Sequence, residues 1–515
     1  MQPIFNTSRR IRLGIWGLGR GASFFKACEA LNFEIVAGCD FNQHLRDRFT
    51  KANPRAMVTA DAAEFLAQDF DAVLLATFCP DHAEDAIRCL NAGKHVLSEV
   101  TAFHTPAEGV KLVEAVERTG LVYNLAENYP FSAANMWLEE KWREGLFGEL
   151  MYAEFEYVHE LRELAYLYLD GSPIQPDGSL HSWRSWMDYH FYCTHSLGPI
   201  MLITGTRPTR VVSLPATQVL PGYPATRVQK LAGLAGIAPS LINMSNGGVV
   251  RNLMGSTTAD THVQRLWGTR GAAFQNAGKP LELQLGGFGH SPKHGIKPSW
   301  PKLGEQAANA GHGGGDFWVL YYFARQILTG ERAPIDVYAA ADMTLPGILA
   351  YRSALENGRP YEVPDFRDKK QRDAWRNDDA RPARLDTKRH LFGDAAGTEK
   401  VKGFNALFQT ITKHIRTFRA YKDWSAVANA ITEPDALLNV ALELQKLLPE
   451  LVKTYTTARK IADANPGTEG ARVLEELLEF GGEREAISRE FADKLRAHIN
   501  SLRTGAKQPE LVGAR

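Results

Sequence analysis

The sequence predicts an α/β domain, followed by an α+β domain with an open, mostly antiparallel sheet and by a C-terminal helical extension. Three observations lead to this order. Short, continuously apolar runs alternate with helical patterns at the start of the chain, as expected for parallel strands covered on both faces. Longer strand-like runs follow up to Gly268. From about Val401 to Thr504, apolar residues recur at the spacings of three and four that are typical of helices.

The α/β domain is expected to span residues 1–130. Alternation of strand and helix over this length is the pattern of a doubly wound sheet of the Rossmann type. The predicted strands are Ile11–Gly17, Glu34–Asp40, Phe70–Thr77, His95–Val100 and Leu121–Glu127, and the predicted helices are about Ala22–Leu31, Asp81–Ala92 and Pro106–Thr119.

The α+β domain is expected to span residues 131–367. A helix comes first and long strand-like runs follow it, which indicates a largely antiparallel sheet. Residues 287–315 are rich in Gly, Pro, Lys and His and are predicted to form a loop. The predicted helices are Ala133–Glu144, Asp316–Thr329 and Val337–Glu356, and the predicted strands are Leu150–His159, Arg210–Val219, Leu241–Gly255 and Thr261–Gly268.

The last part of the chain is predicted to contain a connector and a helical extension. The charged stretch "DKKQRDAWRNDDARPARLD", from Asp368 to Asp386, indicates a surface connector over residues 368–400. Residues 401–515 then form the extension, which is expected to serve packing or oligomerisation, with an active-site lid as the alternative.

Composition excludes several classes of protein. The chain has 515 residues, enough for two or three domains, and its 44% hydrophobic and 23% charged residues are ordinary for a globular protein. Lys+Arg and Asp+Glu are balanced at 59 each, so no net field favours nucleic acid or an anionic membrane. The five cysteines include no CxxC pair, which favours reduced thiols. The start of the chain lacks an apolar leader and no run approaches the roughly 20 apolar residues of a membrane helix, so a cytoplasmic protein is expected.

The turn "GIWGLGRGASFF" carries the first candidate binding site. Gly17, Gly19 and Ala22 fit G-x-G-x-x-G/A directly after a predicted strand and before a predicted helix. In this pattern the glycines allow a tight turn and close approach of a pyrophosphate, and the small third residue lets the helix pack on the strand. We therefore expect Gly17, Leu18, Gly19 and Arg20 to bind a dinucleotide cofactor.

The acid at the end of the next strand indicates which dinucleotide is bound. Asp40 can accept hydrogen bonds from a ribose 2′-hydroxyl, which favours NAD. Arg46 follows closely and could serve a 2′-phosphate, so NADP stays an alternative. A second segment, "TFCPDHAEDA", is also expected to face the cofactor, through Thr77 at the end of a strand and His82 at the start of a helix. His82 is interpreted as a helix cap or a neighbour of the nicotinamide ribose.

The segments "GLGRGASF", "CPDHAEDAIRCLNAGKHVLSE" and "HGGGDFWVLYYFARQILTG" resemble the Gfo/Idh/MocA oxidoreductases over about residues 10–366. The resemblance implies an N-terminal NAD-binding Rossmann domain and a C-terminal α+β domain that binds a carbohydrate. It also implies that the open sheet supports a homo-oligomer, a dimer or a tetramer. Ordinary members carry E-K-P after the fourth strand and a D-x-x-x-H pair in the second domain. Here Glu99-Val100-Thr101 replaces the first motif, and "YCTHSLGPIM" stands where the second is expected.

Both departures coincide with one branch of this family, which resembles the NAD-dependent α-N-acetylgalactosaminidases of glycoside hydrolase family 109. That branch has E-V-P in place of E-K-P. Two differences remain: Cys193 stands for a proline and Ser196 for a glycine. Four further motifs match in order, namely Glu127-Asn128, "EYVHELR" with Tyr157, His159 and Arg162, the pair Trp183-Arg184, and Tyr192-Cys193-Thr194-His195-Ser196-Leu197-Gly198-Pro199.

The resemblance implies a redox-neutral glycosidase that oxidises a sugar at C3, eliminates the C1 substituent across C1–C2, adds water and reverses the oxidation. It assigns His195 to the proton at O3 and Tyr157 to the C2 proton, with a cation such as Arg184 stabilising the phenolate. By the same resemblance, Glu127 meets the substrate near the nicotinamide. Glu99 and Asn128 bind the cofactor, His159 and Tyr192 bind sugar hydroxyls or relay protons, and Arg162, Trp183 and Arg184 contact substrate or serve structure.

Other interpretations stay open at this point. A net dehydrogenase that releases a keto-sugar and NADH is the main alternative, because a histidine can serve the same proton as the missing lysine. A cofactor-bound regulatory protein is another. A metal site at His181, Asp188 and His190 is conceivable, but their spacing fits no helical ligand set, so no metal is predicted. Neither nucleic acid nor a membrane is expected as a partner.

Overall fold

The chain divides into two compact units in a computed structural model, and each unit is described by itself. The first unit consists of Met1–Glu160, Trp186–Leu220 and Gln229–Leu385, and the second consists of Leu161–Ser185, Pro221–Val228 and Asp386–Arg515. The structure describes residues 4–159, 168–169, 172–173, 183–220, 236–256, 261–276, 279–287, 289–300, 303–382, 404–427 and 434–504.

The first unit begins with a six-stranded parallel sheet in the order β3-β2-β1-β4-β5-β6. The order reverses between β1 and β4, and ligands of such sheets bind beyond the carboxyl ends of the strands at this point. The strands are β1 (Ile11–Trp16), β2 (Phe33–Cys39), β3 (Met57–Thr59), β4 (Ala72–Leu75), β5 (His95–Ser98) and β6 (Tyr123–Leu125).

Helices connect these strands, and α5 shows how the sequence sets their limits. Thr105 and Glu108 form a reciprocal capping box, Pro106 occupies the first helical position, and Gly120 ends the helix at a φ of 65°. The helix therefore spans the predicted residues Pro106–Thr119. The others are η1 (Arg20–Phe24), α1 (Phe25–Ala30), α2 (Gln43–Ala52), α3 (Ala62–Leu66), η2 (Cys79–Asp81) and α4 (His82–Asn91).

A nine-stranded sheet forms the other half of the first unit, in the order β16-β15-β14-β13-β7-β12-β11-β10-β17. Only the β7–β12 pair is parallel among the paired strands described, so the sheet is mostly antiparallel, as predicted. The strands are β7 (Leu150–Val158), β10 (Pro208–Val212), β11 (Ile237–Met244), β12 (Val249–Gly255), β13 (Gln264–Gly268), β14 (Gly271–Gln275), β15 (Leu281–Leu285), β16 (Lys293–Ile296) and β17 (Tyr361–Glu362).

Three predictions for this half were wrong in detail. The single strand expected at Leu241–Gly255 is a hairpin of β11 and β12, because Asn246-Gly247 turns the chain and Gly247 has a φ of 87°. The strand expected at Arg210–Val219 ends at Val212, shortly before Pro215, which has no N–H for a ladder. The predicted loop at 287–315 contains β16, α9 (Gly304–Ala308) and η7 (His312–Gly314).

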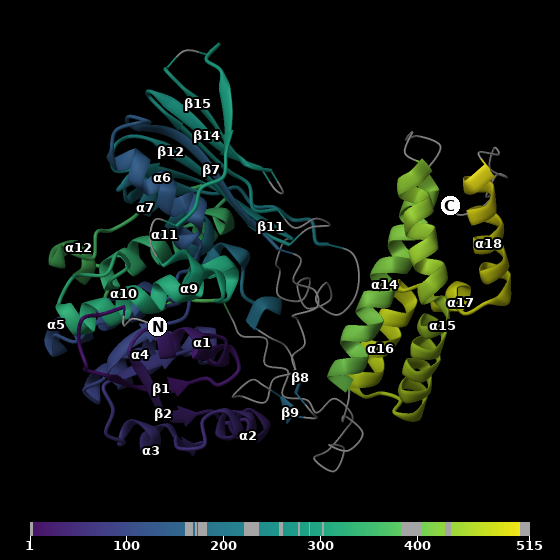
Figure 1. Ribbon diagram of the computed structural model, residues 1–515, viewed down its shortest axis with the longest axis horizontal. Helices are drawn as coiled ribbons and strands as arrows, with labels where there is room; N and C mark the ends of the chain where they lie inside the picture. The colour runs from purple at the N-terminus through teal and green to yellow at the C-terminus, as the bar shows by residue number, and fades with distance from the viewer. Residues whose placement is uncertain are drawn as a thin grey trace. The chain divides into compact units, whose positions relative to one another are not determined.

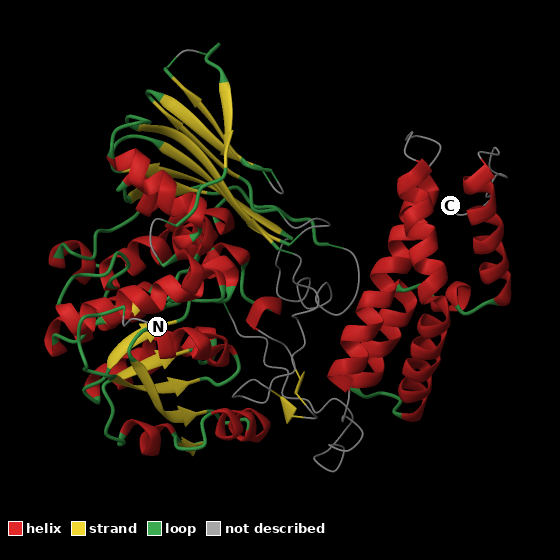
Figure 2. Cartoon of the chain, in the orientation of Figure 1, coloured by secondary structure: helices red, strands yellow, loops and turns green. Residues whose placement is uncertain are grey.

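Helices lie between the two sheets of this unit (Figures 1 and 2). Helix α11 contacts β6 of the parallel sheet and β10 of the larger one, and so it joins the two halves. The helices and turns here are η3 (Tyr129–Phe131), α6 (Ala133–Arg143), η6 (Tyr189–Tyr192), α7 (Thr194–Thr204), α10 (Gly315–Thr329) and α11 (Val337–Leu355).

The stretch expected to be a surface connector begins as part of the first unit. It forms α12 (Lys369–Asp373), in which Arg372 is only 2% exposed and donates to both carboxylate oxygens of Glu117 at 2.7 and 2.8 Å. Arg376 pairs with Glu114 on the same helix, α5. These pairs attach the stretch to the parallel-sheet domain as far as the structure describes it. The part from 383 to 400 lies outside the described residues.

The second unit contains the predicted helical extension. Helix α15 (Pro434–Ala464) contacts α14 (Phe404–Val427), α16 (Glu469–Phe480), α17 (Glu483–Ala486) and α18 (Arg489–Thr504). Their facing sides form a separate apolar core that includes Phe418, Tyr455 and Leu477. The unit also holds the short strands β8 (Tyr168–Leu169) and β9 (Ser172–Pro173) and the turn η5 (Trp183–Ser185). Among the helices that the structure describes, none combines the length and apolar character needed to span a bilayer.

The separate core leads to a first prediction. Replacing the fully buried Leu477 by alanine should destabilise the helical unit by about 2–5 kcal/mol, because it leaves a cavity among packed helices. In differential scanning calorimetry, one melting transition should move to lower temperature and the other should stay. Ile487→Ala in the same unit, at a side chain that is 42% exposed, is the control and should have little effect. Equal shifts of both transitions in Leu477→Ala would contradict two separate cores.

Candidate functional site

The glycine-rich turn has the geometry that a dinucleotide site requires. Gly17 has a φ of 94°, and a Cβ at this position would lie 2.0 Å from the main-chain oxygen of Ala76, so no other residue fits. A Cβ on Gly19 would meet only Leu45 Cδ1, at 3.6 Å, which leaves its main chain open to a ligand. The close approach of helix and strand that was predicted at Ala22 occurs instead at Gly21, where a Cβ would lie 2.6 Å from Ile15 Cγ2.

Asp40 follows the carboxyl end of β2 and is tied to the same turn. Its Oδ2 accepts the main-chain N–H of Leu18 and its Oδ1 that of Asn42, both at 2.8 Å. Burial raises the pKa of this carboxyl group. Arg46 donates to the main-chain oxygens of Asp40 and Phe41, so its guanidinium already has partners in the loop after β2.

The predicted cofactor residues Arg20, Glu99 and Asn128 converge on a residue that sequence reasoning missed, Asp316. Arg20 Nε lies 2.8 Å from Glu99 Oε1, and the two terminal nitrogens of Arg20 donate to the two oxygens of Asp316 at 2.9 and 2.7 Å. Asn128 Nδ2 donates to Asp316 Oδ1 at 3.1 Å. His312, whose side chain is half-exposed, lies 3.0 Å from Asp316 Oδ2. Asp316 itself is fully buried.

Glycines make room for this cluster. A Cβ on Gly311 would lie 2.4 Å from Asp316 Oδ2, and a Cβ on Gly315 would lie 2.6 Å from the main-chain oxygen of Asn128. The motif "HGGGD" therefore brings the start of α10 against the end of the parallel sheet. Three glycines directly before an acid at a helix start were the signal that could have identified Asp316.

Two oxygen atoms of the cluster are buried without a hydrogen-bond donor among the described residues: Glu99 Oε1, whose contact with Arg20 is an ion pair without hydrogen-bond alignment, and Asn128 Oδ1. Buried acceptors without donors are uncommon in native proteins and call for a ligand or water. Together with the open main chain at Gly19, they show that the residues present fit a bound dinucleotide.

Thr77 and His82 both have hydrogen-bond partners within the protein. Thr77 Oγ1 donates to Asp85 at 2.8 Å. The ring nitrogens of the buried His82 face the main-chain oxygens of Thr101, at 3.1 Å, and of Thr77, at 3.2 Å. Burial lowers the pKa of His82. His82 thus braces two turns at the carboxyl end of the sheet, and neither ring nitrogen points toward a ligand.

The catalytic candidates Glu127 and His195 form a buried pair. His195 Nδ1 lies 2.8 and 2.9 Å from the two carboxylate oxygens of Glu127, which is fully buried. The N–H of Tyr129 donates to one of these oxygens at 3.1 Å. Glu127 follows β6, and His195 lies in the first turn of α7, so the pair links the parallel sheet to the α+β domain. With Nδ1 held by Glu127, Nε2 is the nitrogen that is left for proton transfer.

Aromatic rings surround the imidazole of His195. Tyr129 stacks on it with ring centroids 4.4 Å apart, and Tyr192 and Tyr157 meet it edge-on at 4.6 and 4.7 Å. Tyr157 is 8% exposed and lies on the inner face of β7. Two more rings extend the group: His159 lies 5.8 Å from Tyr157, and His262 lies 5.2 Å from Tyr157 and 3.3 Å, through Nδ1, from the Tyr129 hydroxyl. Tyr129 and His262 were not predicted.

Cys193 and Ser196, the two residues that differ from the family motif, each donate a hydrogen bond to another element. The thiol of Cys193 donates to the main-chain oxygen of Met343 at 3.2 Å, and burial raises its pKa to about 12, so it stays a thiol. The hydroxyl of Ser196 donates to Asn252 Oδ1 and thereby ties α7 to β12. Both residues hold α7, and with it His195, in place.

Four other residues from the sequence analysis lie in the second unit or outside the described residues. Trp183 and Arg184 belong to the second unit, where the Arg184 guanidinium lies 4.2 Å from the centre of the Trp183 ring. Arg162 and His181 lie outside the described residues. His190 pairs with Asp188 at 2.7 Å and with Ser213 at 2.9 Å, and these contacts hold the turn before α7.

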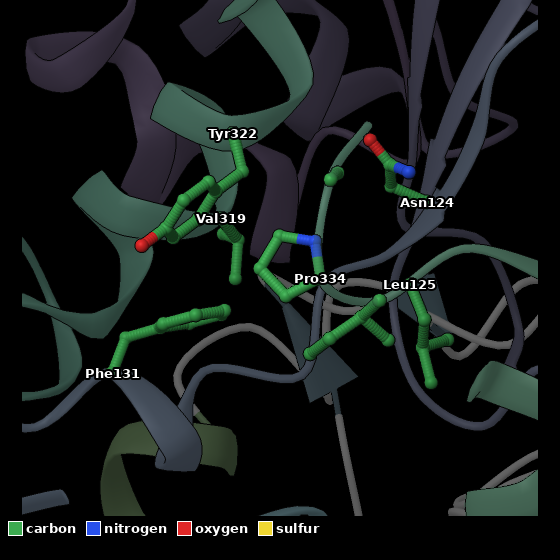
Figure 3. Close-up of a pocket in the computed structure, with 8 residues that line it drawn as sticks. Asn124, Leu125, Phe131, Val319, Tyr322 and Pro334 are labelled. Atoms are coloured by element: carbon green, nitrogen blue, oxygen red, sulfur yellow. The ribbon is translucent and has the colours of Figure 1, made fainter. Parts of the chain in front are cut away.

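A small pocket lies near the cluster but does not suit a sugar. It is lined by residues of β6, η3 and α10, and Figure 3 shows Phe131, Pro334 and Tyr322 around it. Its volume is about 10 Å³, which holds roughly one water molecule. The pocket is therefore a packing defect between the sheet and α10.

Asp85, the partner of Thr77, gives a pH-dependent prediction. Burial raises the pKa of Asp85 to about 6, so the fold loses stability as the pH rises from the ordinary carboxyl range through about 6. Asp85→Asn removes this loss. The free energy of unfolding should increase by about 1–3 kcal/mol at about pH 8 and stay nearly unchanged at about pH 4. Urea unfolding at the two pH values checks this, and an equal effect at both would contradict the assignment.

Comparison with known proteins agrees with this geometry. Residues 11–127 match the sequence model of the oxidoreductase family with an NAD-binding Rossmann fold, and residues 293–375 match that of the glycosyl hydrolase 109 C-terminal domain. A glycosyl hydrolase family 109 protein of Shewanella putrefaciens (strain CN-32) is 29% identical over 411 residues, covering 71% of this chain and 86% of the relative. One of Shewanella baltica (strain OS155) is 28% identical over the same length and coverage.

Solved structures share the fold. A levoglucosan dehydrogenase in complex with NADH and levoglucosan superposes with a TM-score of 0.58 at 19% identity, over 69% of this chain and 100% of that one. An aldose-aldose oxidoreductase from Caulobacter crescentus gives 0.54 at 17% identity, also over 69% and 100%. The predicted resemblance is thus confirmed: the chain is an NAD-dependent enzyme that is similar to the Gfo/Idh/MocA oxidoreductases over residues 11–127 and to the glycosyl hydrolase 109 C-terminal domain over residues 293–375.

Proposed function

We propose that this enzyme is a redox-neutral glycosidase that oxidises its sugar transiently at C3. The observation that supports this most is the buried Glu127–His195 pair, enclosed by Tyr129, Tyr157 and Tyr192 beside the cofactor residues. Tyr192 lies within electrostatic range of the Arg20 guanidinium, so the two groups of residues adjoin. Relatives that match 71% of this chain are named as family 109 glycosyl hydrolases.

The cofactor would be held by the main chain of Gly17–Arg20, by Asp40 at the adenosine end and by Glu99 and Asn128 at the nicotinamide end. Asp40 favours NAD over NADP, because a buried carboxylate accepts ribose hydroxyls and repels a 2′-phosphate. Bound NAD⁺ supplies a hydride acceptor for C3 and the hydride that restores the alcohol at the end. Everything else in the cycle is proton transfer and positioning by the protein.

His195 holds the proton of the C3 hydroxyl. Its Nδ1 faces the Glu127 carboxylate, which balances the positive charge that the imidazole gains when Nε2 takes this proton. The stacked Tyr129 and the edges of Tyr157 and Tyr192 fix the ring plane and exclude water. Glu127 is therefore proposed to position His195, in place of the substrate contact predicted from sequence.

Tyr157 is the candidate for the proton at C2. A ketone at C3 acidifies the neighbouring C–H, so a phenolate can remove the proton and the C1–O bond breaks in the next step. Water then adds at C1, and Tyr157, whose phenol proton has meanwhile exchanged with solvent, delivers a proton to C2. A phenol is a weak base near neutral pH unless a cation stabilises its anion. His159 is the nearest predicted partner of Tyr157 in the structure.

The second candidate function is a net dehydrogenase. The same His195 could take the proton of a sugar hydroxyl, and the fold is shared with levoglucosan dehydrogenase. The presence of Tyr157 beside His195 favours the glycosidase, because a dehydrogenase needs no base at C2. The homo-oligomer, the cytoplasmic location and the choice of sugar stay predictions.

Turnover of a panel of aryl α- and β-glycosides separates the two functions. The purified protein should release the aryl group and the free sugar without a net rise in NADH absorbance. His195→Ala should lose this activity by about 10²–10⁴-fold while keeping bound NAD, because it removes the proton acceptor alone. NADH that accumulates together with a keto-sugar would establish the dehydrogenase. Full activity of His195→Ala would remove His195 from the mechanism.

Glu127→Gln tests the pair itself. The amide can still accept the Nδ1 proton, but it no longer balances the charge on His195, so kcat should fall by about 100-fold with NAD affinity unchanged. Glu108→Gln is a matched control, since Glu108 also accepts main-chain N–H groups but caps α5. Its kcat should match that of the parent. A large rise in KM with constant kcat in Glu127→Gln would indicate substrate binding instead.

A further inference from the structure

The cluster around Asp316 joins four segments that are distant in sequence. Arg20 comes from the glycine-rich turn, Glu99 from the end of β5, Asn128 from the end of β6, and Asp316 from the first turn of α10. Three of these segments lie at the carboxyl edge of the parallel sheet, where dinucleotides bind. Asp316 is the one member that comes from the α+β half of the unit.

Both carboxylate oxygens of Asp316 accept hydrogen bonds within this cluster. Oδ1 accepts Arg20 Nη2 and Asn128 Nδ2, and Oδ2 accepts Arg20 Nη1 and lies beside His312. Burial opposes its ionisation, but the hydrogen bonds from Arg20 and His312 outweigh burial and hold the pKa of Asp316 well below its usual range. The carboxylate is therefore a permanent charge, and the absence of a side chain at Gly311 leaves room for it.

Arg20 is directed toward protein carboxylates. Each of its three side-chain nitrogens has a protein partner, through Glu99 on one side and Asp316 on the other. Burial lowers the pKa of Arg20, but the two carboxylates raise this pKa by more, so the guanidinium stays charged. Arg20 therefore holds the Glu99 and Asp316 carboxylates in fixed positions relative to each other.

The two acceptors without donors, Glu99 Oε1 and Asn128 Oδ1, belong to the two side chains that contact Arg20 and Asp316. Each needs an O–H or N–H donor. Phosphate groups offer acceptors only, whereas the ribose hydroxyls and the carboxamide of the nicotinamide half of NAD offer donors. Donation from Asn128 Nδ2 to Asp316 also fixes which way the amide points, so that its oxygen faces the ligand.

We propose that Asp316 is a positioning residue for NAD, which acts through Arg20 and Asn128 to aim Glu99 Oε1 and Asn128 Oδ1 at the nicotinamide riboside half. Asp316 does not touch the cofactor. It sets the two acceptors that do, and it couples cofactor binding to the α+β half of the unit. The proposal rests on NAD binding and is independent of the glycosidase cycle.

The dissociation constant of NAD, measured by isothermal titration calorimetry on the full-length protein freed of cofactor, tests this. Asp316→Asn and Arg20→Gln should each weaken NAD binding by about tenfold or more, because each removes the ion pair that holds the two acceptors in place. If Asp316→Asn does not fold, Arg20→Gln removes the same ion pair from its partly exposed end. The double variant should bind NAD no more weakly than the weaker single variant, since both remove one interaction.

Asp342→Asn is the matched control. Asp342 is 2% exposed and is held by Arg207 and Arg367, so Asp342→Asn also replaces a buried, arginine-paired carboxylate, and the NAD dissociation constant should stay within about twofold of the parent. A drop in melting temperature without a change in NAD affinity in Asp316→Asn would overturn the proposal, as would additive effects in the double variant. Absence of glycosidase activity would leave these results untouched and would count against the proposed function alone.

Discussion

The site depends on the buried contact between the Glu127 carboxylate and His195 Nδ1. One partner stands at the end of the parallel sheet and the other at the start of α7, so the pair can form only when the two halves of the first unit are packed together. A carboxylate that is fully buried is costly unless it is paired, and here the imidazole and a main-chain N–H pair it. The same contact that stabilises the junction of the halves therefore prepares a histidine for proton transfer.

A second buried carboxylate, Asp316 of α10, also links the two halves, because it accepts hydrogen bonds from Arg20 of the glycine-rich turn. The two acids divide the site chemically. In the proposed mechanism, Glu127 serves the ring that takes the substrate proton, and Asp316 serves the residues that hold the cofactor. Val100 and Thr101 of the substituted turn have no titratable side chain, and the candidate for proton transfer is His195 on α7, beside Tyr157 of β7.

Much of the fold could be predicted, because the signals that set helix ends and turns lie within short segments of the sequence. The caps of α5 and the glycine turn after β1 are examples. The hairpin at Asn246-Gly247 was missed although Asn-Gly is a strong turn signal, because the strand-like residues on both sides of it were interpreted as a single strand. The partners of the site were harder to predict. Arg20 and Asp316 are 296 positions apart, and no spacing rule links them until both halves have folded. Tyr129 and His262 were missed for the same reason, since only their stacking around His195 and Tyr157 makes them visible.

The most direct test of the account is the isotopic composition of the sugar released in D₂O. If a base removes the C2 proton while the C3 hydride is stored and returned, the product should carry one deuterium at C2 and retain its original hydrogen at C3, with no net NADH. Nuclear magnetic resonance of the product together with cofactor absorbance gives this result in one reaction. A product without deuterium at C2 would mean that the glycosidic bond breaks by direct displacement, and the roles given to Tyr157 and His195 would be wrong.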